Sequence, residues 1–257
     1  MKNKVLGSVL GAALLAGSTA VVADSPFAAE NFSSTLTFTT DYTFRGVTFS
    51  EDDFAIQGSF DWGNGPWFAG AWASSTTPYS ESGLGGTAEL DLYFGWADNV
   101  GGVDLMVMPL WYTFPGESGA GDNTTFELWT SAGMGFDNLP GTPYVTLSAN
   151  YAPEYFDCDT CANSDGDADS ALYTSIAVAF ALPDGWGLDF LYGYQDVGGT
   201  GENAFFADDY SHVQVGLTKS AAGFDFDVRY HDNKDASTIG KGFAKDSEVE
   251  FTVSRSF

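Results

Sequence analysis

The feature that most constrains this chain is an alternation of apolar and polar residues with a period of two. In one segment Leu188, Phe190 and Tyr192 alternate with smaller or polar residues such as Asp189. This pattern is typical of a β-strand with two different faces. It recurs in segments 32–45, 54–62, 89–96, 126–136, 145–151, 172–182, 212–217, 224–231 and 248–257. Segments 67–74 and 103–114 are apolar on both faces, so we expect strands there without assigning their sides.

The connections between these segments differ in length. Short turns are expected at 64–66, 98–101, 138–141, 183–185 and 221–223, where Gly, Pro, Asn and Asp cluster. Longer polar loops alternate with them, at 46–52, 75–86, 115–123, 152–170, 196–208 and 232–246. About twelve strands with short turns at one end and long loops at the other are typical of a bacterial outer-membrane barrel, with both termini in the periplasm.

The two faces of the expected strands favour a membrane barrel over a water-soluble β-sandwich or lipocalin-like barrel. The apolar face is rich in Phe, Tyr, Trp and Leu, and Arg255 is the one charge that we place on it. The chain also stops inside a strand, at Phe257, and this aromatic end resembles the signal that the barrel-assembly machinery reads. We therefore expect an all-β transmembrane antiparallel barrel over residues 24–257, located in the outer membrane of a Gram-negative bacterium and in contact with its lipid.

Residues 1–23 have the features of a secretory signal peptide. Lys2 and Lys4 supply positive charge, an apolar run follows from Val5 to Ala16, and small residues end the segment at Ala23. The run is shorter than the roughly 20 apolar residues that a membrane-spanning helix needs. We expect cleavage before Asp24.

Charge narrows the possible partners and predicts the interior. A net charge of −26 argues against nucleic acid or anionic lipid as a partner. The polar faces carry an excess of acidic residues, and rings of carboxylates in a narrow pore favour cations. The residues expected in the lumen are Asp41, Arg45, Asp53, Glu89, Asp91, Asp104, Glu127, Asp189, Asp225, Asp227, Arg229, Glu248 and Glu250. Alternatively, the lumen shares the acidity of the whole chain without any selective role.

The loop 152–170 holds two further candidate sites. Cys158 and Cys161 cannot complete a four-ligand zinc site, and export leads to an oxidising space, so we expect a disulfide rather than a redox-active pair. Asp165, Asp167 and Asp169 alternate beside Gly166 and could bind Ca²⁺, although their spacing departs from the EF-hand loop. A solvated acidic loop tip is the alternative, and no other cofactor is expected.

A catalytic site is not expected. His212 and His231 fall on the polar face, with Ser211, Asp225 and Asp227 in neighbouring segments. A Ser/His/Asp hydrolase acting on lipid could be assembled from these residues. No local motif marks a nucleophile, however, and many aspartates place one near any histidine.

The segment Thr39–Val47, with the sequence TTDYTFRGV, resembles the opening of a proteobacterial family known as Gcw_chp or TorF-family porins. The chain is similar to that family in length, leader and terminal Phe. The resemblance implies an outer-membrane, porin-like protein without catalytic residues. We expect a channel for the passive diffusion of small cationic or neutral solutes, with a lumen partly occupied by side chains or a folded loop. The alternative is a non-conducting surface protein that anchors acidic binding loops.

Overall fold

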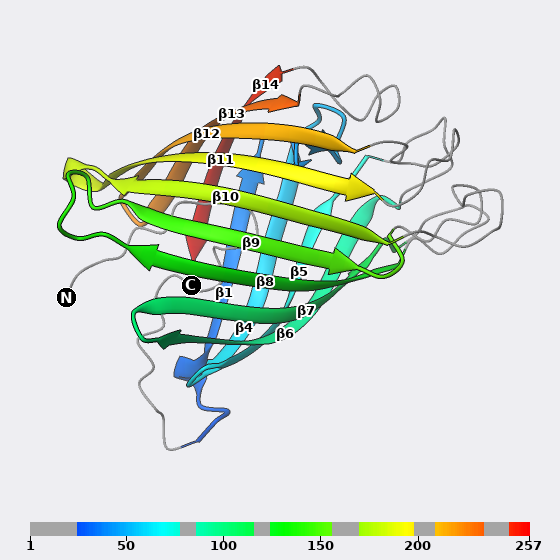
Figure 1. Cartoon of the computed structure of the whole chain (residues 1–257). Helices are drawn as coiled ribbons and strands as arrows, with labels where there is room; N and C mark the ends of the chain where they lie inside the picture. Colours follow the sequence, from blue (N-terminus) through cyan, green and yellow to red (C-terminus); the bar gives the residue numbers. More distant parts are fainter. Residues whose placement is uncertain (1–24, 78–85, 116–123, 156–169, 198–208, 234–246) are drawn as a thin grey trace.

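The computed structural model describes residues 25–77, 86–115, 124–155, 170–197, 209–233 and 247–257. Within these residues, twelve antiparallel strands close into a barrel (Figure 1). They are β1 (Phe32–Thr39), β4 (Ala55–Asn64), β5 (Trp67–Ser75), β6 (Ala88–Val100), β7 (Val103–Thr113), β8 (Thr125–Gly135), β9 (Tyr144–Ala152), β10 (Ala171–Ala181), β11 (Trp186–Val197), β12 (Tyr210–Ala221), β13 (Phe224–Asn233) and β14 (Ser247–Ser256). Two short 3₁₀ turns, η2 (Ala29–Asn31) and η3 (Pro183–Gly185), flank strands.

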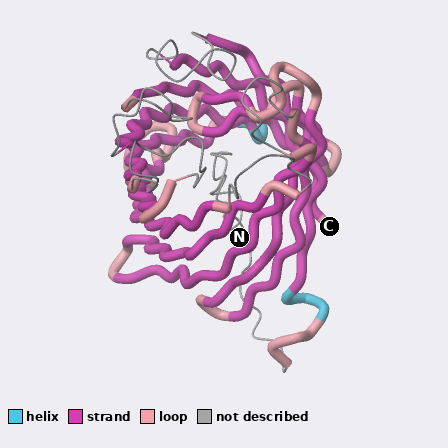
Figure 2. The backbone as a smooth tube through the Cα atoms, turned by 90° about the vertical axis from the view of Figure 1, so that its right-hand side faces the viewer, coloured by secondary structure: helices cyan, strands magenta, loops and turns pink. Residues whose placement is uncertain are grey.

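Each strand pairs with its neighbours in the chain, and β1 closes the barrel. Thr35 in β1 lies opposite Ser59 of β4 on one side and Ser256 of β14 on the other. The ring of strands is visible in a view turned by 90° (Figure 2). Closure leaves no unpaired strand edge in the wall. The expected all-β barrel of about twelve strands is confirmed.

The short turns follow from residues that tolerate a left-handed backbone. Gly101 and Gly102 both have positive φ angles, of 63° and 93°, between β6 and β7. Ala222 and Gly223 do the same between β12 and β13, with φ angles of 55° and 80°. Two consecutive positive φ angles define the type I′ turn, whose twist matches that of paired strands.

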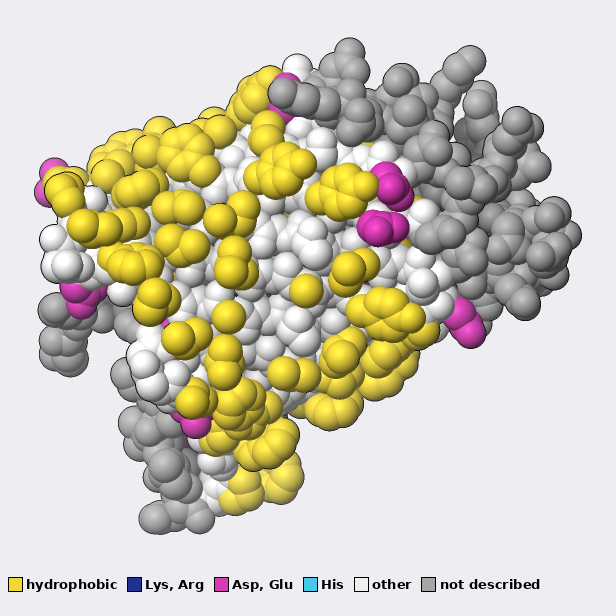
Figure 3. Space-filling view, in the orientation of Figure 1, with side chains coloured by type: hydrophobic (Ala, Val, Ile, Leu, Met, Phe, Trp, Pro, Cys, Tyr) yellow, Lys and Arg dark blue, Asp and Glu magenta, His cyan; other side chains and the backbone are white. Residues whose placement is uncertain are grey.

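Alternation along each strand separates an outer face from an inner face. In β11, Phe190 and Tyr192 are 44% and 49% exposed. Asp189 and Leu191, which alternate with them, are 1% and 5% exposed. On the face of the wall that Figure 3 shows, hydrophobic side chains are spread across the strands, and acidic side chains lie near the edges. Strands β5 and β7 carry apolar side chains on their inner face as well as on their outer face. The inner ones pack together in a buried cluster. Phe68, Met106 and Met108 belong to this buried inner cluster.

The first strand is shorter than the sequence pattern predicts. β1 ends at Thr39, and a separate two-stranded sheet follows, formed by β2 (Thr43–Phe44) and β3 (Val47–Thr48). The alternation over 32–45 predicts Tyr42 on the same apolar face as Leu36 and Phe38, but it is 3% exposed and packs inside the barrel. The alternation continues past Thr39 because β2 and β3 are extended strands too. A period of two in the sequence therefore cannot show where the strand of the barrel wall ends.

Some expectations fall outside the described residues. These are the signal peptide and its cleavage site, Cys158 and Cys161, and the aspartates at 165, 167 and 169. Among the described residues, no helix is long and apolar enough to cross a membrane.

Candidate functional site

The hairpin formed by residues 40–53, called the inserted hairpin below, lies inside the barrel. Its two strands pair Thr43 with Thr48 and Phe44 with Val47. Arg45 and Gly46 form the turn, with φ angles of 51° and 77°. Thr43, Val47 and Thr48 are 1%, 1% and 3% exposed, so the hairpin is buried on both of its faces. A polar connection between wall strands therefore folds inward instead of projecting into solvent.

Arg45, at the tip of the inserted hairpin, forms a bidentate ion pair with Glu127 of β8. Its Nη1 donates to Glu127 Oε1 and its Nη2 to Oε2, each at 2.8 Å. Nη1 also donates to Gln195 Oε1 of β11 at 3.1 Å. The side chains of the ion pair are 4% and 1% exposed. Burial opposes the charge on Arg45, but attraction to Glu127 raises the pKa of the guanidinium above its ordinary value, so the charge persists.

Aromatic rings complete the surroundings of the guanidinium. Its central carbon lies 4.2 Å from the ring centroid of Tyr173, 4.6 Å from that of Phe44 and 5.5 Å from that of Trp129. Such contacts stabilise a cation by about 0.5–2 kcal/mol, depending on its solvation. Glu127 also accepts hydrogen bonds from Tyr112 Oη at 2.9 Å and from Trp129 Nε1 at 2.6 Å. The Glu127 carboxylate thus accepts four hydrogen bonds inside the barrel, from Arg45, Tyr112 and Trp129.

These contacts carry the hairpin across the interior. The hairpin leaves the wall between β1 and β4, whereas Glu127 and Gln195 belong to β8 and β11. In the order of strands around the barrel, β9 lies opposite β1, and β8 and β11 lie near it. Arg45 therefore fastens the tip of the hairpin to the far wall. The segment lies across the lumen and must narrow it.

Gly46 allows the close approach of the hairpin to β12 and β13. A Cβ atom at this position would lie 2.8 Å from His212 Cβ, and the φ of +77° would strain any other residue. The carbonyl of Gly46 accepts a hydrogen bond from Asn233 Nδ2 at 3.1 Å. Both the turn and the packing require glycine here.

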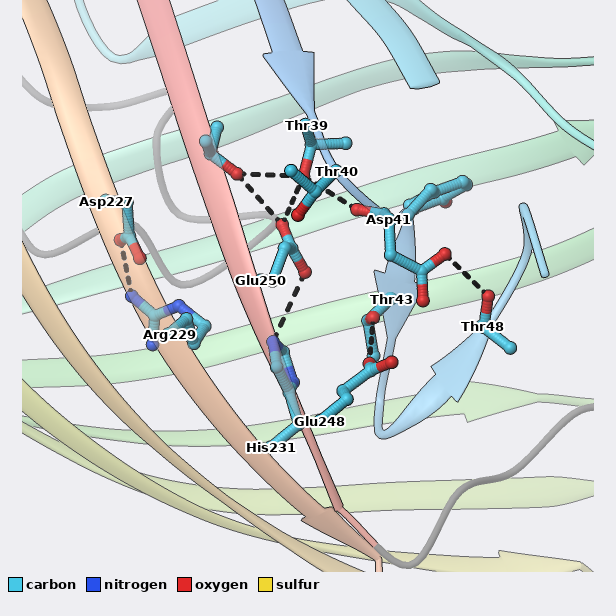
Figure 4. Close-up of polar contacts among 12 residues, drawn as sticks. Thr39, Thr40, Asp41, Thr43, Thr48, Asp227, Arg229, His231, Glu248 and Glu250 are labelled. Atoms are coloured by element: carbon cyan, nitrogen blue, oxygen red, sulfur yellow. Dashed lines mark hydrogen bonds and ion pairs between the residues drawn. The ribbon is translucent and has the colours of Figure 1, made fainter. Parts of the chain in front are cut away.

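A second buried network lies on the wall strands β11 and β13. Arg229 Nη1 donates to Asp189 at 2.7 Å, and its Nη2 donates to Asp227 at 2.9 Å. Both arginines expected in the lumen are thus neutralised by buried carboxylates. Nearby, the Glu250 carboxylate accepts from Thr39 Oγ1 at 2.8 Å and lies 3.2 Å from His231 Nε2 (Figure 4).

The remaining predicted lumen residues differ in burial. Glu89 and Asp91 of β6 are 2% and 7% exposed. Asp104 of β7 is half-buried and accepts from Tyr144 Oη at 2.6 Å. Asp53 is exposed and precedes β4, so it does not lie on a wall strand as the alternation predicted.

Because Asp225, Asp227, Glu248 and Glu250 fall on adjacent C-terminal strands, the sequence predicts that they form one cluster, and this prediction is wrong. Asp225 lies opposite Ser254 of β14, whereas Glu248 lies opposite His231, six residues further along β13 than Asp225. At about 3.4 Å per residue, they are separated by roughly 20 Å along the strands. Asp225 is exposed near the turn to β12, and Glu248 belongs to the other end of the barrel. Adjacent strands share a surface, but the antiparallel register decides which residues meet.

The described residues do not assemble the Ser/His/Asp arrangement of a hydrolase. Ser211 and His212 are consecutive in β12 and therefore point to opposite faces of the strand. His212 Nε2 lies 3.0 Å from Tyr173 Oη, and Asp227 is engaged by Arg229. Both histidines are buried inside the barrel.

Sequence reasoning identified Arg45 as a residue of the polar face but missed its position at a hairpin tip. The available signal was the Arg45–Gly46 pair, since glycine after a polar residue favours a tight turn between extended segments. The partner residue, 82 positions away, left no local signal.

The fold and its interior define the class: a closed antiparallel β-barrel of twelve strands with a hairpin folded into it. A family model described as "Bacterial protein of unknown function (Gcw_chp)" matches residues 20–257. The chain belongs to the Gcw_chp family. That description names no function, and the TorF name suggested by the sequence stays a prediction.

Solved structures agree with this fold at very low sequence identity. The NanC porin has a TM-score of 0.55 and 10% identity, with 87% of this chain and 97% of that one covered. The KdgM porin has a TM-score of 0.54 and 6% identity, covering 88% and 99%. The COG4313 outer membrane channel from Pseudomonas putida F1 has a TM-score of 0.54 and 13% identity, covering 88% and 95%. No curated protein matches the chain.

Proposed function

We propose that this protein is an outer-membrane channel for the passive diffusion of small solutes, narrowed by the inserted hairpin. The observation that carries the proposal is a closed twelve-strand barrel whose interior is crossed by the hairpin. Twelve strands enclose more space than the side-chain-filled barrels of eight strands and less than the open porins of sixteen. A folded segment inside such a barrel leaves a restricted path.

The outer surface supports the membrane location. Exposed aromatic and aliphatic side chains such as Phe60, Leu147 and Phe190 lie around the barrel wall. Large contiguous apolar surfaces are rare on soluble monomers, and they mark places of contact with lipid or protein. A barrel of this kind would reach the outer membrane through a leader in residues 1–23 and the barrel-assembly machinery, with Phe257 in the assembly signal.

Charge inside the barrel supports a preference for cationic or neutral solutes. With Arg45 and Arg229 both engaged by carboxylates, the other inner acidic residues of the described strands set the local potential. Asp61 and Asp104 are half-buried on inner faces near the short-turn end, where each accepts a hydrogen bond from a tyrosine. Carboxylates within low-dielectric walls act more strongly than those on an open surface.

The test is the reversal potential of the purified channel in planar bilayers across a salt gradient. We expect the wild type to prefer cations, and the preference to fade as salt rises, because the Debye length falls from about 10 Å at 0.1 M to about 3 Å at 1 M. The double variant D61N/D104N should reduce the preference. Asp98, exposed on the outer face of β6, supplies the matched control D98N.

Two results would contradict this proposal in different ways. An anion-selective or non-selective wild-type pore would refute the charge argument while leaving the channel intact. A barrel that inserts but never conducts would favour the second candidate, a surface protein that anchors acidic loops. The burial of residues 41–50, of which only Phe44 is partly exposed, favours that candidate, because a tightly held hairpin could close the barrel.

A further inference from the structure

Three carboxylates from two separate parts of the chain meet at the base of the inserted hairpin. Asp41 and Asp52 belong to the hairpin, and Glu248 belongs to β14. One oxygen of each lies within 4.8 Å of the others. The view of the site shows the carboxylates of Asp41 and Glu248 approaching from the hairpin and from the wall strand (Figure 4). The three residues are called the acidic triad below.

Asp41 is held by donors that occupy only one of its oxygens. Its Oδ1 accepts from Thr48 Oγ1 at 2.7 Å and from Ser50 Oγ at 2.6 Å. Its Oδ2 is buried without a hydrogen-bond partner, although the residue is only 5% exposed. Buried polar atoms are almost always paired, so this carboxylate oxygen, without a protein donor, is available to a ligand or ion.

We propose that the acidic triad binds a divalent cation, with Ca²⁺ as the best fit. Ca²⁺ is coordinated by oxygens at about 2.3–2.6 Å, so two ligands on opposite sides of the ion lie about 4.6–5.2 Å apart. A single ion can therefore contact one oxygen from each member of the triad. The free Oδ2 of Asp41 becomes a ligand, while its Oδ1 keeps the hydrogen bonds that position the side chain.

The chemistry of the triad selects the class of ion. All three side chains offer hard oxygen atoms, which suit Ca²⁺, Mg²⁺ and Mn²⁺ rather than softer metals. Asp52 is exposed and Glu248 half-buried, so an ion can enter from solvent and keep water in its remaining positions. An irregular, partly hydrated oxygen site suits the flexible coordination of Ca²⁺ better than the strict octahedron of Mg²⁺.

The bound ion would join the hairpin base to the strand that closes the barrel. Asp41 and Glu248 are far apart in sequence, yet Thr43 of the hairpin already donates a hydrogen bond to Glu248. Arg45 fastens the tip of the hairpin, and the ion would fasten its base. This inference is independent of whether the barrel conducts.

The experiment measures metal binding to the full mature barrel, folded in detergent and stripped with EDTA. Tb³⁺ serves as a luminescent probe excited through aromatic side chains, and Ca²⁺ is titrated as the competitor. We expect D41N, D52N and E248Q each to weaken Ca²⁺ competition by roughly tenfold or more, because each removes one charged ligand. Ca²⁺ should also raise the thermal midpoint of the wild type and not of these variants.

Matched controls separate this site from other acidic surfaces. D98N removes an exposed carboxylate from the opposite end of the barrel and should leave binding unchanged. The triple variant D165N/D167N/D169N neutralises the three aspartates of the loop 152–170. If that variant alone abolishes binding, or if the triad variants bind like the wild type, the proposal is wrong. Should D41N fail to fold, E248Q and D52N decide the outcome, with heat-modifiable migration on gels confirming folding.

Discussion

Substitution of Arg45 by alanine is the most informative perturbation of the inserted hairpin. The change removes the ion pair with Glu127, the contact with Gln195 and the packing of the guanidinium against three rings. Glu127 is left as a buried carboxylate, 1% exposed, that keeps the hydrogen bonds from Tyr112 and Trp129 but loses its counterion. Breaking a buried ion pair by removing one partner costs about 3–5 kcal/mol.

That cost applies to the docked hairpin and not to the strand pairing of the wall. Since every 1.4 kcal/mol is a factor of ten, undocking should become favoured by about 10²- to 10⁴-fold. Hydrogen exchange of the amides in residues 40–53 should accelerate by a factor in this range in R45A, while the amides of β10 and β11 stay protected. Single-channel conductance should rise in the same variant as the hairpin leaves the lumen.

The double variant R45M/E127M is the control for the charge argument. Replacing both partners of a buried pair with apolar residues is often close to neutral, so exchange at the hairpin should return towards the wild-type rate. If R45A shows wild-type exchange and conductance, the ion pair does not hold the hairpin. If exchange also accelerates in β10 and β11, Arg45 supports the whole barrel rather than the hairpin alone.

Three further predictions test other parts of the structure. G46A should release the hairpin, because its Cβ would lie 2.8 Å from His212 Cβ; G223A shares the positive φ but meets nothing within 4 Å, so it should leave hairpin exchange unchanged. V215R places charge on the outer face and should cost about 2–4 kcal/mol near the membrane midplane, whereas Q214R on the inner face should cost much less; equal unfolding free energies would refute the face assignment. Cys158 and Cys161 should be oxidised in the mature protein, and two free thiols or a bound metal in mass spectra of non-reduced peptides would contradict this.

The strands of the wall could be predicted from sequence because their signal is local. A side chain on a strand faces inward or outward according to parity alone, so the alternation in segments such as 188–195 reports both the strand and its two environments. Glycine pairs such as Gly101–Gly102 mark turns by the same local logic. Strands β5 and β7 were expected without sides because their inner residues pack in an apolar cluster, which removes the contrast.

Only the tertiary structure decided what lies inside the barrel. The segment 40–48 alternates like a wall strand, and nothing local distinguishes an extended segment in the wall from one that crosses the interior. Arg45 meets Glu127 across 82 residues, and Thr43 meets Glu248 across 205. Likewise, Asp225 and Glu248 lie on adjacent strands but at opposite ends, because the antiparallel register sets their separation. The sequence by itself determined a barrel with two faces, whereas closure and register determined which charges meet inside it.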